Sequence, residues 1–278
     1  MNPHLQLVNT RPLNAGGNGD LLLGQRSDTG EWIVRKYLRE YASPHARAAF
    51  RREVRVLMRK YRGLIRILDS DTEAERPYYD MPYLSGGCLT THAGKLFESQ
   101  LMAIAIDLAH TLADVHARFD AHGDVKPDNI LVTHDGHIQV ADPLGNGINC
   151  TVVFAQNHGG TPGYWAPEIS TGGAVSAAGD AHAYGATLYH LATGRRPCDG
   201  QILDIAVKNY AIPSKIKEVI MACCQSSASD RPSMKEVLRI LAGERWIDIQ
   251  AANRRTKGLV MAACVLGGLF LLLGGLGD

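Results

Sequence analysis

Short apolar runs separated by glycine turns characterise roughly the first hundred residues of the chain. Runs of four to eight residues bounded by turn residues are typical of β-strands. The pattern predicts strands at 13–25 (two strands around a glycine turn), 32–38, 65–68 and 78–81. One helix is expected among them, at 45–60, where apolar side chains occupy one face and basic side chains the opposite face. This part of the chain therefore predicts a small sheet with one helix.

The second half of the chain has the spacing of amphipathic helices. Residues 100–119 carry apolar side chains at helical intervals, and Asp135-Gly136 predicts a tight hairpin. Further helices are expected at 180–193, 215–224 and 233–241, and residues 246–257 predict a short polar connector. The pattern indicates an α+β, bilobal fold, in which a small sheet-rich lobe precedes a larger helical lobe.

The composition of the 278-residue chain narrows the class of protein. Apolar residues make up 45% and the net charge is +1. The core is therefore ample, and no nucleic-acid partner is expected. Six cysteines form no Cys-x-x-Cys pair, which argues against a structural zinc site or a disulfide framework. Because residues 1–12 lack the pattern of a signal peptide, we expect the polar part of the chain in the cytoplasm.

The segment 258–277 contains no charged residue and is apolar or glycine throughout. About 20 such residues in a helix span roughly 30 Å, the thickness of a bilayer core. Arg254, Arg255 and Lys257 precede the segment and only Asp278 follows it, which places the large N-terminal part in the cytoplasm. We therefore expect a single-pass tail anchor; the alternative is a buried C-terminal helix.

Small residues recur on one stripe of this predicted membrane helix. Ala263 and Gly267, like Cys264 and Gly268, are separated by four positions. Such spacing lets two membrane helices approach closely. A homodimer through this stripe is therefore a hypothesis.

The loop 122–129, His-Gly-Asp-Val-Lys-Pro-Asp-Asn, carries the strongest chemical signal. Asp124 can accept the proton of an attacking hydroxyl, Lys126 can neutralise a γ-phosphate, and Asn129 can hold Mg²⁺. This spacing is that of the catalytic loop of protein kinases. The alternative, a polar turn between two elements, predicts no such set of groups.

A glycine-rich turn lies upstream, at residues 14–19. Glycines there let backbone N–H groups approach phosphate oxygens. Lys36, on the following strand, and Glu53, on the helix, could form the pair that grips the α- and β-phosphates. Each of these charges alone would more often be a solvated surface residue.

The chain resembles the eukaryotic-type protein kinase family over about residues 12–243. Besides the loop 122–129, the resemblance rests on Ile33–Lys36, Met81–Gly87, Asp142, Gly160–Glu168, Asp180 and Asp230-Arg231-Pro232. It implies a protein kinase domain at 12–243, a basic juxtamembrane linker at 244–257 and a transmembrane helix at 258–277.

The same resemblance implies a role for individual residues. Asp124 and Lys126 would be catalytic, with ATP and Mg²⁺ (or Mn²⁺) as cofactors and a protein serine or threonine as substrate. Asp180 would brace the catalytic loop, and Arg231 would pair with Glu168. The implied metal ligands are Asn129 and Asp142, and the implied nucleotide-binding residues are Asn14, Gly16, Gly19, Leu21, Val34, Lys36, Glu53, Met81, Tyr83 and Leu131.

Three positions depart from the family pattern. Asn14 stands for the first glycine of the phosphate loop. Gly123 replaces the arginine that receives an activation-segment phosphate in the family, which suggests activity that does not wait for phosphorylation. The segment 142–145, Asp-Pro-Leu-Gly, replaces Asp-Phe-Gly, so Leu144 is expected to do the packing of the phenylalanine.

The predicted function is that of a membrane-anchored serine/threonine protein kinase, of bacterial origin and in the inner membrane. Thr161 favours serine/threonine over tyrosine specificity, and Thr151 is the candidate for autophosphorylation. The alternatives are a pseudokinase that serves as a membrane-bound interaction platform, favoured by the altered 142–145 segment, and a small-molecule kinase.

Overall fold

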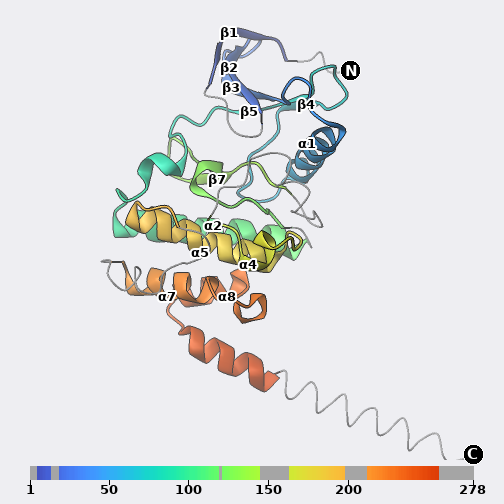
Figure 1. Cartoon of the computed structure of the whole chain (residues 1–278). Helices are drawn as coiled ribbons and strands as arrows, with labels where there is room; N and C mark the ends of the chain where they lie inside the picture. Colours follow the sequence, from blue (N-terminus) through green and yellow to red (C-terminus); the bar gives the residue numbers. More distant parts are fainter. Residues whose placement is uncertain (1–4, 14–18, 119–120, 145–162, 198–211, 257–278) are drawn as a thin grey trace, which may run out of the picture.

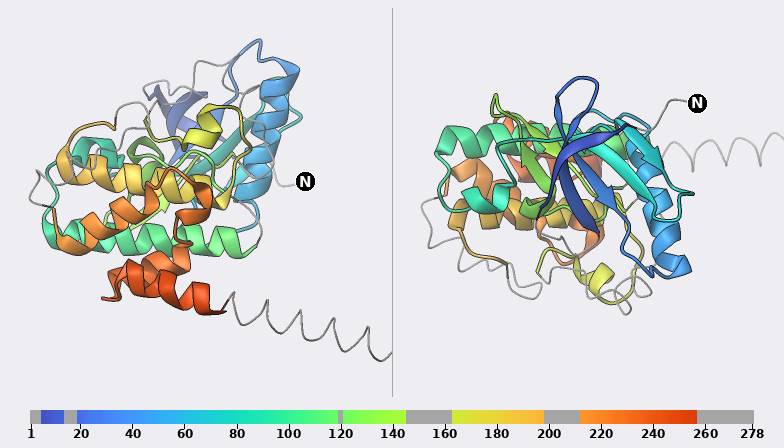
Figure 2. Two further views of the ribbon diagram at one scale, coloured as in Figure 1. Left: turned by 60° about the horizontal axis from the view of Figure 1, so that its bottom comes forward. Right: turned by 90° about the horizontal axis from the view of Figure 1, so that it is seen from above.

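A computed structural model describes residues 5–13, 19–118, 121–144, 163–197 and 212–256. A small β-rich part with one helix lies above a larger helical part (Figure 1). Seen from above, the sheet crosses over the helical layer (Figure 2). The expected bilobal α+β arrangement is present within these ranges.

The upper part is an antiparallel five-stranded sheet in the order β1-β2-β3-β5-β4. A hairpin at Gly30, whose φ of +72° suits glycine, joins β2 to β3. The strands are β1 (Leu7–Pro12), β2 (Asp20–Arg26), β3 (Trp32–Tyr37), β4 (Asp69–Asp71) and β5 (Tyr78–Pro82).

The register of the central strands places Lys36 beside Tyr79 on one face of the sheet. On β3, Lys36 lies between Leu21 of β2 and Tyr79 of β5, and Val34 lies opposite Met81. Residues that face each other across antiparallel strands point to the same side of the sheet. Lys36 and Tyr79 therefore project together toward the helix that follows.

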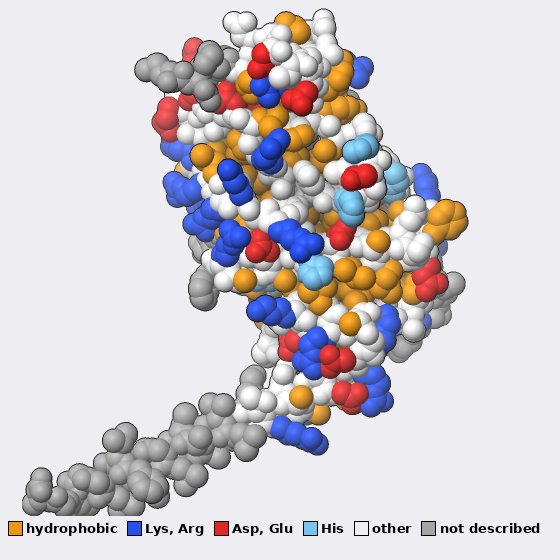
Figure 3. Space-filling model, turned by 180° about the vertical axis from the view of Figure 1, so that it is seen from behind, with side chains coloured by type: hydrophobic (Ala, Val, Ile, Leu, Met, Phe, Trp, Pro, Cys, Tyr) orange, Lys and Arg blue, Asp and Glu red, His pale blue; other side chains and the backbone are white. Residues whose placement is uncertain are grey.

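That helix is α1 (Pro44–Leu57), which begins where the Ser43 side chain accepts a hydrogen bond from the Ala46 N–H. Phe50 packs on the Tyr79 ring at 5.6 Å between centroids. The opposite face is basic, as predicted, and Lys and Arg side chains gather on the side of the molecule that carries α1 (Figure 3). The exposed cations at the end of α1 and just beyond are Arg55, Arg59, Lys60, Arg62 and Arg66.

The lower part is built around α5 (Ala177–Thr193), in which every residue from Gly179 to Leu191 is buried. Helix α2 (Glu98–Ala117) packs on α5, and α7 (Ser214–Cys223) and α8 (Met234–Leu241) lie below them (Figure 1). Short elements complete this part: α4 (Pro167–Ser170) and the 3₁₀ turns η1 (Leu89–His92), η2 (Pro127–Asn129) and η3 (Ala228–Asp230).

A two-stranded hairpin of β6 (Ile130–Val132) and β7 (Ile138–Val140) carries the loop that precedes it. Its turn contains Gly136, with φ +85°, as expected from Asp135-Gly136. The Ile65 N–H donates to the Val140 carbonyl at 2.9 Å, which ties the hairpin to the segment after α1. The hairpin thus lies where the two parts of the molecule meet.

Two strand predictions in the first part were displaced. The first strand is β1, at Leu7–Pro12, whereas the pattern predicted a first strand that begins at residue 13. It is an edge strand with five exposed residues, so it carries no apolar signal. Residues 65–68 form no strand because they cross between the two parts, and β4 follows them at Asp69–Asp71.

Residues 246–256 form a helix where a polar connector was expected. Ile249 is fully buried in the main core, and Trp246 packs partly against it. The Trp246 backbone N–H donates to Glu218 at 2.6 Å and the Asn253 amide donates to Glu236 at 2.6 Å. This helix is therefore docked on α7 and α8.

Within the described ranges, no helix is long and apolar enough to cross a membrane. The predicted span at 258–277 lies outside those ranges, as does the small-residue stripe within it. Both stay predictions.

Candidate active site

The loop between α2 and β6 is held by a carboxylate from below. The Asp180 side chain, 1% exposed on α5, accepts hydrogen bonds from the backbone N–H groups of His122 at 2.7 Å and Gly123 at 2.8 Å. The His116 imidazole contacts the same carboxylate at 2.9 Å. Asp180 thus fixes the backbone just ahead of Asp124, as the sequence suggested.

Asp124, Lys126 and Asn129 meet in this loop. The Lys126 ammonium and the Asn129 amide both donate to Asp124 Oδ2, at 2.7 and 2.8 Å, and the amide also reaches the Asp124 carbonyl at 2.9 Å. Among the described residues, Asp124 Oδ1 has no hydrogen-bond partner. One oxygen is therefore fixed by two donors while the other can accept a proton from a hydroxyl group.

Lys36 lies at the centre of a second cluster, between the sheet and α1. Lys36 is buried, and its ammonium is 2.8 Å from Glu53 Oε1 and 2.8 Å from Asp142 Oδ1. The Tyr79 hydroxyl donates to Glu53 Oε1 at 2.6 Å and lies 3.5 Å from Asp142 Oδ1. A buried cation requires such partners, because losing its hydration costs several kcal/mol.

The pKa values of this cluster follow from burial and from the charges it brings together. Burial raises the pKa of Glu53 to about 6, because the Lys36 ammonium offsets only part of that penalty. Burial alone would also raise the pKa of Asp142, but Lys36 holds it below its usual value. Burial would lower the pKa of Lys36, yet the two carboxylates raise it, so the lysine stays charged.

The altered segment at 142–144 still presents Asp142 to Lys36. Asp142 has a left-handed backbone, with φ +59°. On either side of it, His122 Nε2 lies 3.0 Å from the Ala141 carbonyl, and the Leu144 N–H donates to the His122 carbonyl at 2.7 Å. Proline at position 143 does not prevent this turn, and the catalytic loop holds it from both ends.

Leu144 packs beside a small apolar cluster formed by Ala121, Ala166, Ile169 and Val175, as expected of the residue that replaces the phenylalanine. A Cβ on Gly123 would lie 2.8 Å from Val175 Cγ1 and 3.1 Å from Leu144 Cβ, and Gly123 has φ +84°. Apolar side chains therefore close the space next to the position where the family has arginine.

A partly buried ion pair, in which the arginine is buried and the glutamate is partly exposed, stabilises the segment after residue 163. The Arg231 guanidinium binds both oxygens of Glu168, at 2.7 and 2.8 Å. It lowers the pKa of Glu168, although burial acts in the opposite direction. The Tyr164 hydroxyl lies 2.6 Å from His190 Nδ1 on α5. Thr151 and Thr161, the two threonines singled out in the sequence, lie outside the described residues.

The residues predicted to contact the base of the nucleotide come from both parts of the molecule. Val34 and Met81 are adjacent on the sheet and nearly buried. Tyr83 follows β5, is 38% exposed, and donates its N–H to the Trp32 carbonyl at 3.2 Å. Leu131 on β6 bridges to Cys88 in the segment that follows Tyr83.

The phosphate side is described only in part. Leu21 lies beside Lys36 in the register. A Cβ on Gly19 would come within 2.6 Å of the Tyr37 carbonyl, so this position requires glycine for close backbone packing. Asn14 and Gly16 lie outside the described residues.

The sequence analysis missed two residues that contact the site: His116, which binds Asp180, and Tyr79. A tyrosine in an apolar run predicts a core position, and Tyr79 is indeed fully buried. Only the strand register, which places it beside Lys36, and the packing of α1, which brings Glu53 to its hydroxyl, reveal its contact with the ion-pair cluster.

The donor atoms at Asn129 and Asp142 suit Mg²⁺. This ion prefers oxygen ligands and is usually bound through one or two carboxylates together with phosphate oxygens and waters. The Asn129 amide nitrogen is committed to Asp124, which leaves its Oδ1 as an acceptor, and Asp142 Oδ2 has no partner among the described residues. These two oxygens could hold the ion.

The chain belongs to the protein kinase family: the model of the protein kinase domain matches residues 7–241. The family uses ATP and Mg²⁺. The resemblance noted in the sequence is thereby confirmed, and the match begins five residues earlier than the predicted boundary at residue 12, so that it includes β1.

Curated relatives include serine/threonine protein kinases from bacteria. The probable serine/threonine-protein kinase PkwA of Thermomonospora curvata is 30% identical over 84% of this chain and 34% of its own length. The DNA damage-responsive serine/threonine-protein kinase RqkA of Deinococcus radiodurans is 29% identical, over 79% and 36% respectively. PrkC of Bacillus subtilis is 28% identical, over 76% and 36%. The chain therefore spans about a third of the length of these relatives.

Proposed function

We propose that this chain is a serine/threonine protein kinase that transfers the γ-phosphoryl group of Mg-ATP to a protein hydroxyl. One observation carries the proposal: Lys36 contacts both Glu53 and Asp142 at 2.8 Å while Asp124 keeps one oxygen open. Nucleotide-gripping and proton-accepting groups are thus assembled at the same time. Position 123 is a glycine and has no side chain to bind a phosphorylated residue, and the described groups are assembled without such a contact.

Each residue has a separate task in this mechanism. Asp124 Oδ1 orients the substrate hydroxyl and accepts its proton, while Lys126 and Asn129 keep the carboxylate from rotating. Lys126 also neutralises charge on the group being transferred. Lys36, held by Glu53, positions the phosphates, and Asn129 with Asp142 would hold the metal ion. Bound Mg-ATP supplies the phosphoryl group.

A pseudokinase that acts as an interaction platform is the second candidate, because Pro143 and Leu144 depart from the family pattern. The position of Asp142 at Lys36 supports the active enzyme instead. The two candidates differ in one outcome, which is phosphate transfer.

The test is Mg-dependent phosphorylation of a generic basic protein by the full chain in lipid nanodiscs. Asp124→Asn should lower the rate by at least about a hundredfold, because general-base catalysis contributes roughly 10²–10⁴. Lys36→Met should cause a loss of similar size, because positioning the reacting phosphate and stabilising its charge contribute at least as much. Asp135→Asn, which changes an exposed carboxylate in the β6–β7 turn, is the matched control and should keep the activity. Nucleotide binding without transfer by the unmodified chain would establish the platform instead.

We further propose that residues 258–277 anchor the enzyme in a bacterial inner membrane, with the kinase domain in the cytoplasm. It is supported by the uncharged run and by Arg254 and Arg255, exposed at the end of the docked helix. The full chain should stay with membranes after alkaline carbonate extraction, whereas residues 1–256 should be released. Release of both would refute the anchor.

Dimerisation through the small-residue stripe is proposed on the spacing alone. Gly267→Ile with Gly268→Ile should reduce crosslinked dimer in membranes. Leu269→Ile with Leu273→Ile, on the opposite side of the predicted helix, serves as control. An unchanged dimer fraction in the glycine variant would exclude the stripe as the interface.

A further inference from the structure

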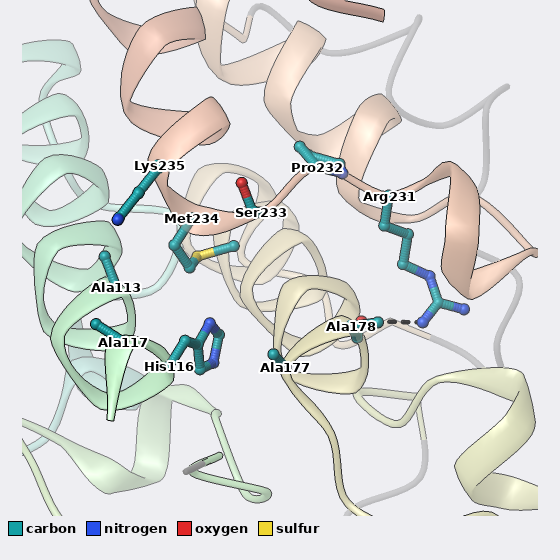
Figure 4. A pocket seen from close by; sticks show the side chains of 10 residues that line it. All are labelled: Ala113, His116, Ala117, Ala177, Ala178, Arg231, Pro232, Ser233, Met234 and Lys235. Atoms are coloured by element: carbon teal, nitrogen blue, oxygen red, sulfur yellow. Dashed lines mark hydrogen bonds between the residues drawn. The ribbon is translucent and has the colours of Figure 1, made fainter. Parts of the chain in front are cut away.

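A hollow of about 350 Å³ opens in the helical part of the molecule. Its lining includes none of the residues proposed to bind the nucleotide. It lies between the end of α2, the start of α5 and the start of α8 (Figure 4). Small side chains create it: Ala113 and Ala117 of α2 lie across from Ala177 and Ala178 of α5, and the Met234 side chain projects from α8 between them. Its volume falls within the range of small-molecule sites, roughly 300–1,000 Å³.

One wall of the hollow is His116, which acts on the catalytic loop. Its Nε2 contacts Asp180 at 2.9 Å, and the Asp180 carboxylate accepts the backbone N–H groups of His122 and Gly123. The other ring nitrogen, Nδ1, has no partner among the described residues. A molecule in the hollow would therefore contact His116, which in turn contacts the Asp180 carboxylate that holds the catalytic loop.

Arg231 forms the wall opposite His116, and it stabilises the segment that ends at Glu168. All five of its N–H donors are used, by Glu168 and by the carbonyls of Ala178, Gln225 and Ser226. Arg231 consequently offers no donor to a ligand and acts as a fixed wall. The hollow thus lies between the support of the catalytic loop and the support of the segment that ends at Glu168.

The remaining polar groups of the hollow favour an anion. Lys235 reaches across from α8 toward Ala113 (Figure 4), and within the described part of the chain it has no ion-pair partner. Ala177 and Ala178 begin α5, and Met234 and Lys235 begin α8, so two helices present their first N–H groups here. Among the described residues, no Asp or Glu belongs to the lining. The nearest carboxylates are already bonded to wall residues: Glu236 accepts the N–H and hydroxyl of Ser233, and Asp180 contacts His116.

We propose that this hollow is a regulatory binding site for a small amphiphilic carboxylate. The apolar body would pack on the alanines and Met234, and the carboxylate would bind the Lys235 ammonium. Occupancy would stiffen the end of α2 and, through Asp180, the catalytic loop. Binding is independent of the proposed kinase activity, and only its effect on turnover rests on that function.

The test uses 4-phenylbutyrate as probe and the full chain in lipid nanodiscs, with empty nanodiscs as reference. Titration calorimetry should show saturable binding at millimolar concentration or below. Lys235→Glu, which repels the carboxylate, and Ala117→Trp, which fills the hollow, should each weaken binding by at least about tenfold. Lys217→Glu on α7 makes the same change of charge outside the hollow and should leave binding unchanged. The uncharged amide of the probe should bind at least about tenfold more weakly.

Hydrogen exchange at His122 and Gly123 reports the coupling without using activity. The bound probe should slow exchange of these two amides in the unmodified chain but not in Lys235→Glu. Absence of saturable binding, or equal binding by Ala117→Trp, would overturn the site. Saturable binding with unchanged exchange would overturn its link to the catalytic loop.

Discussion

Tyr79 shows how one hydroxyl group can set the pH range of a site. Its hydrogen bond to Glu53 favours the ionised carboxylate, whose pKa of about 6 is raised by burial. Lys36 needs that ionised partner to hold its position. Activity should therefore fall as the pH drops through about 6, where Glu53 takes up a proton.

Tyr79→Phe removes the hydrogen bond and should raise the pKa of Glu53 further. We expect the acid limb of kcat/KM for ATP to move up by about 0.5–1 pH unit, with little change at pH 8. The measurement is a profile from pH 5.5 to 8.5. Tyr78→Phe is the control, since that hydroxyl lies on the other face of β5 at Asp69. Superimposable profiles for the unmodified chain and Tyr79→Phe would rule out this role.

Gly123 is required by its surroundings as well as by its backbone. A side chain with φ above zero costs about 1–2 kcal/mol, and crowding against Val175 and Leu144 adds about 1–3 kcal/mol. Gly123→Ala should lower the free energy of unfolding by about 2–5 kcal/mol, measured by urea denaturation.

Gly136→Ala isolates the backbone part of that cost. Gly136 has nearly the same φ, +85°, but a Cβ there would meet nothing within 4 Å. It should lose only about 1–2 kcal/mol. Equal losses for the two variants would mean that Val175 and Leu144 make room, and that an arginine at position 123 would be tolerated.

At the scale of elements, the helix at 246–256 adds a docked segment beyond the part that matches the family model. Ile249 is fully buried and Ile247 is 66% exposed on the same helix. Ile249→Ala should therefore cost about 2–5 kcal/mol in urea denaturation, whereas Ile247→Ala should change stability by less than about 0.5 kcal/mol. Similar small effects of both changes would show that the helix is detached in solution.

Sequence periodicity predicted the elements whose burial is one-sided and regular. Helices α2, α7 and α8 were placed within a few residues, because each has a regular apolar stripe: those of α2 and α7 pack on α5, and that of α8 packs on α2 and α7. Strand β1 was displaced because an exposed edge strand carries no apolar pattern, and the helix at 246–256 was missed because two residues, Trp246 and Ile249, make most of its contact.

The candidate site was predictable where a motif is continuous in the chain. The loop from His122 to Asn129 could be predicted from the spacing of its residues alone. Lys36, Glu53 and Asp142 were predicted from the resemblance to the family. Tyr79 and His116 could not be predicted in this way. Their contacts depend on strand register and helix packing between residues far apart in sequence, which no local spacing encodes.

At the scale of the whole molecule, one apolar cluster runs from Leu23 in the sheet through α2 and α5 to Ile249 in the last described helix. Two parts that share a core should not unfold separately. We expect a single calorimetric transition whose calorimetric and van't Hoff enthalpies agree. Two resolved transitions would mean that the sheet and the helices melt independently.

The shared core also determines how a destabilising substitution affects the activity of this protein. A substitution that loosens packing anywhere between the sheet and the last helix removes the nucleotide groups and the hydroxyl-accepting loop in one event. A cell would then hold a mixture of intact enzyme and unfolded chain, with no half-competent form that binds nucleotide but fails to transfer phosphate. Proteases that clear unfolded chains would lower the amount of enzyme while the survivors keep their full turnover rate.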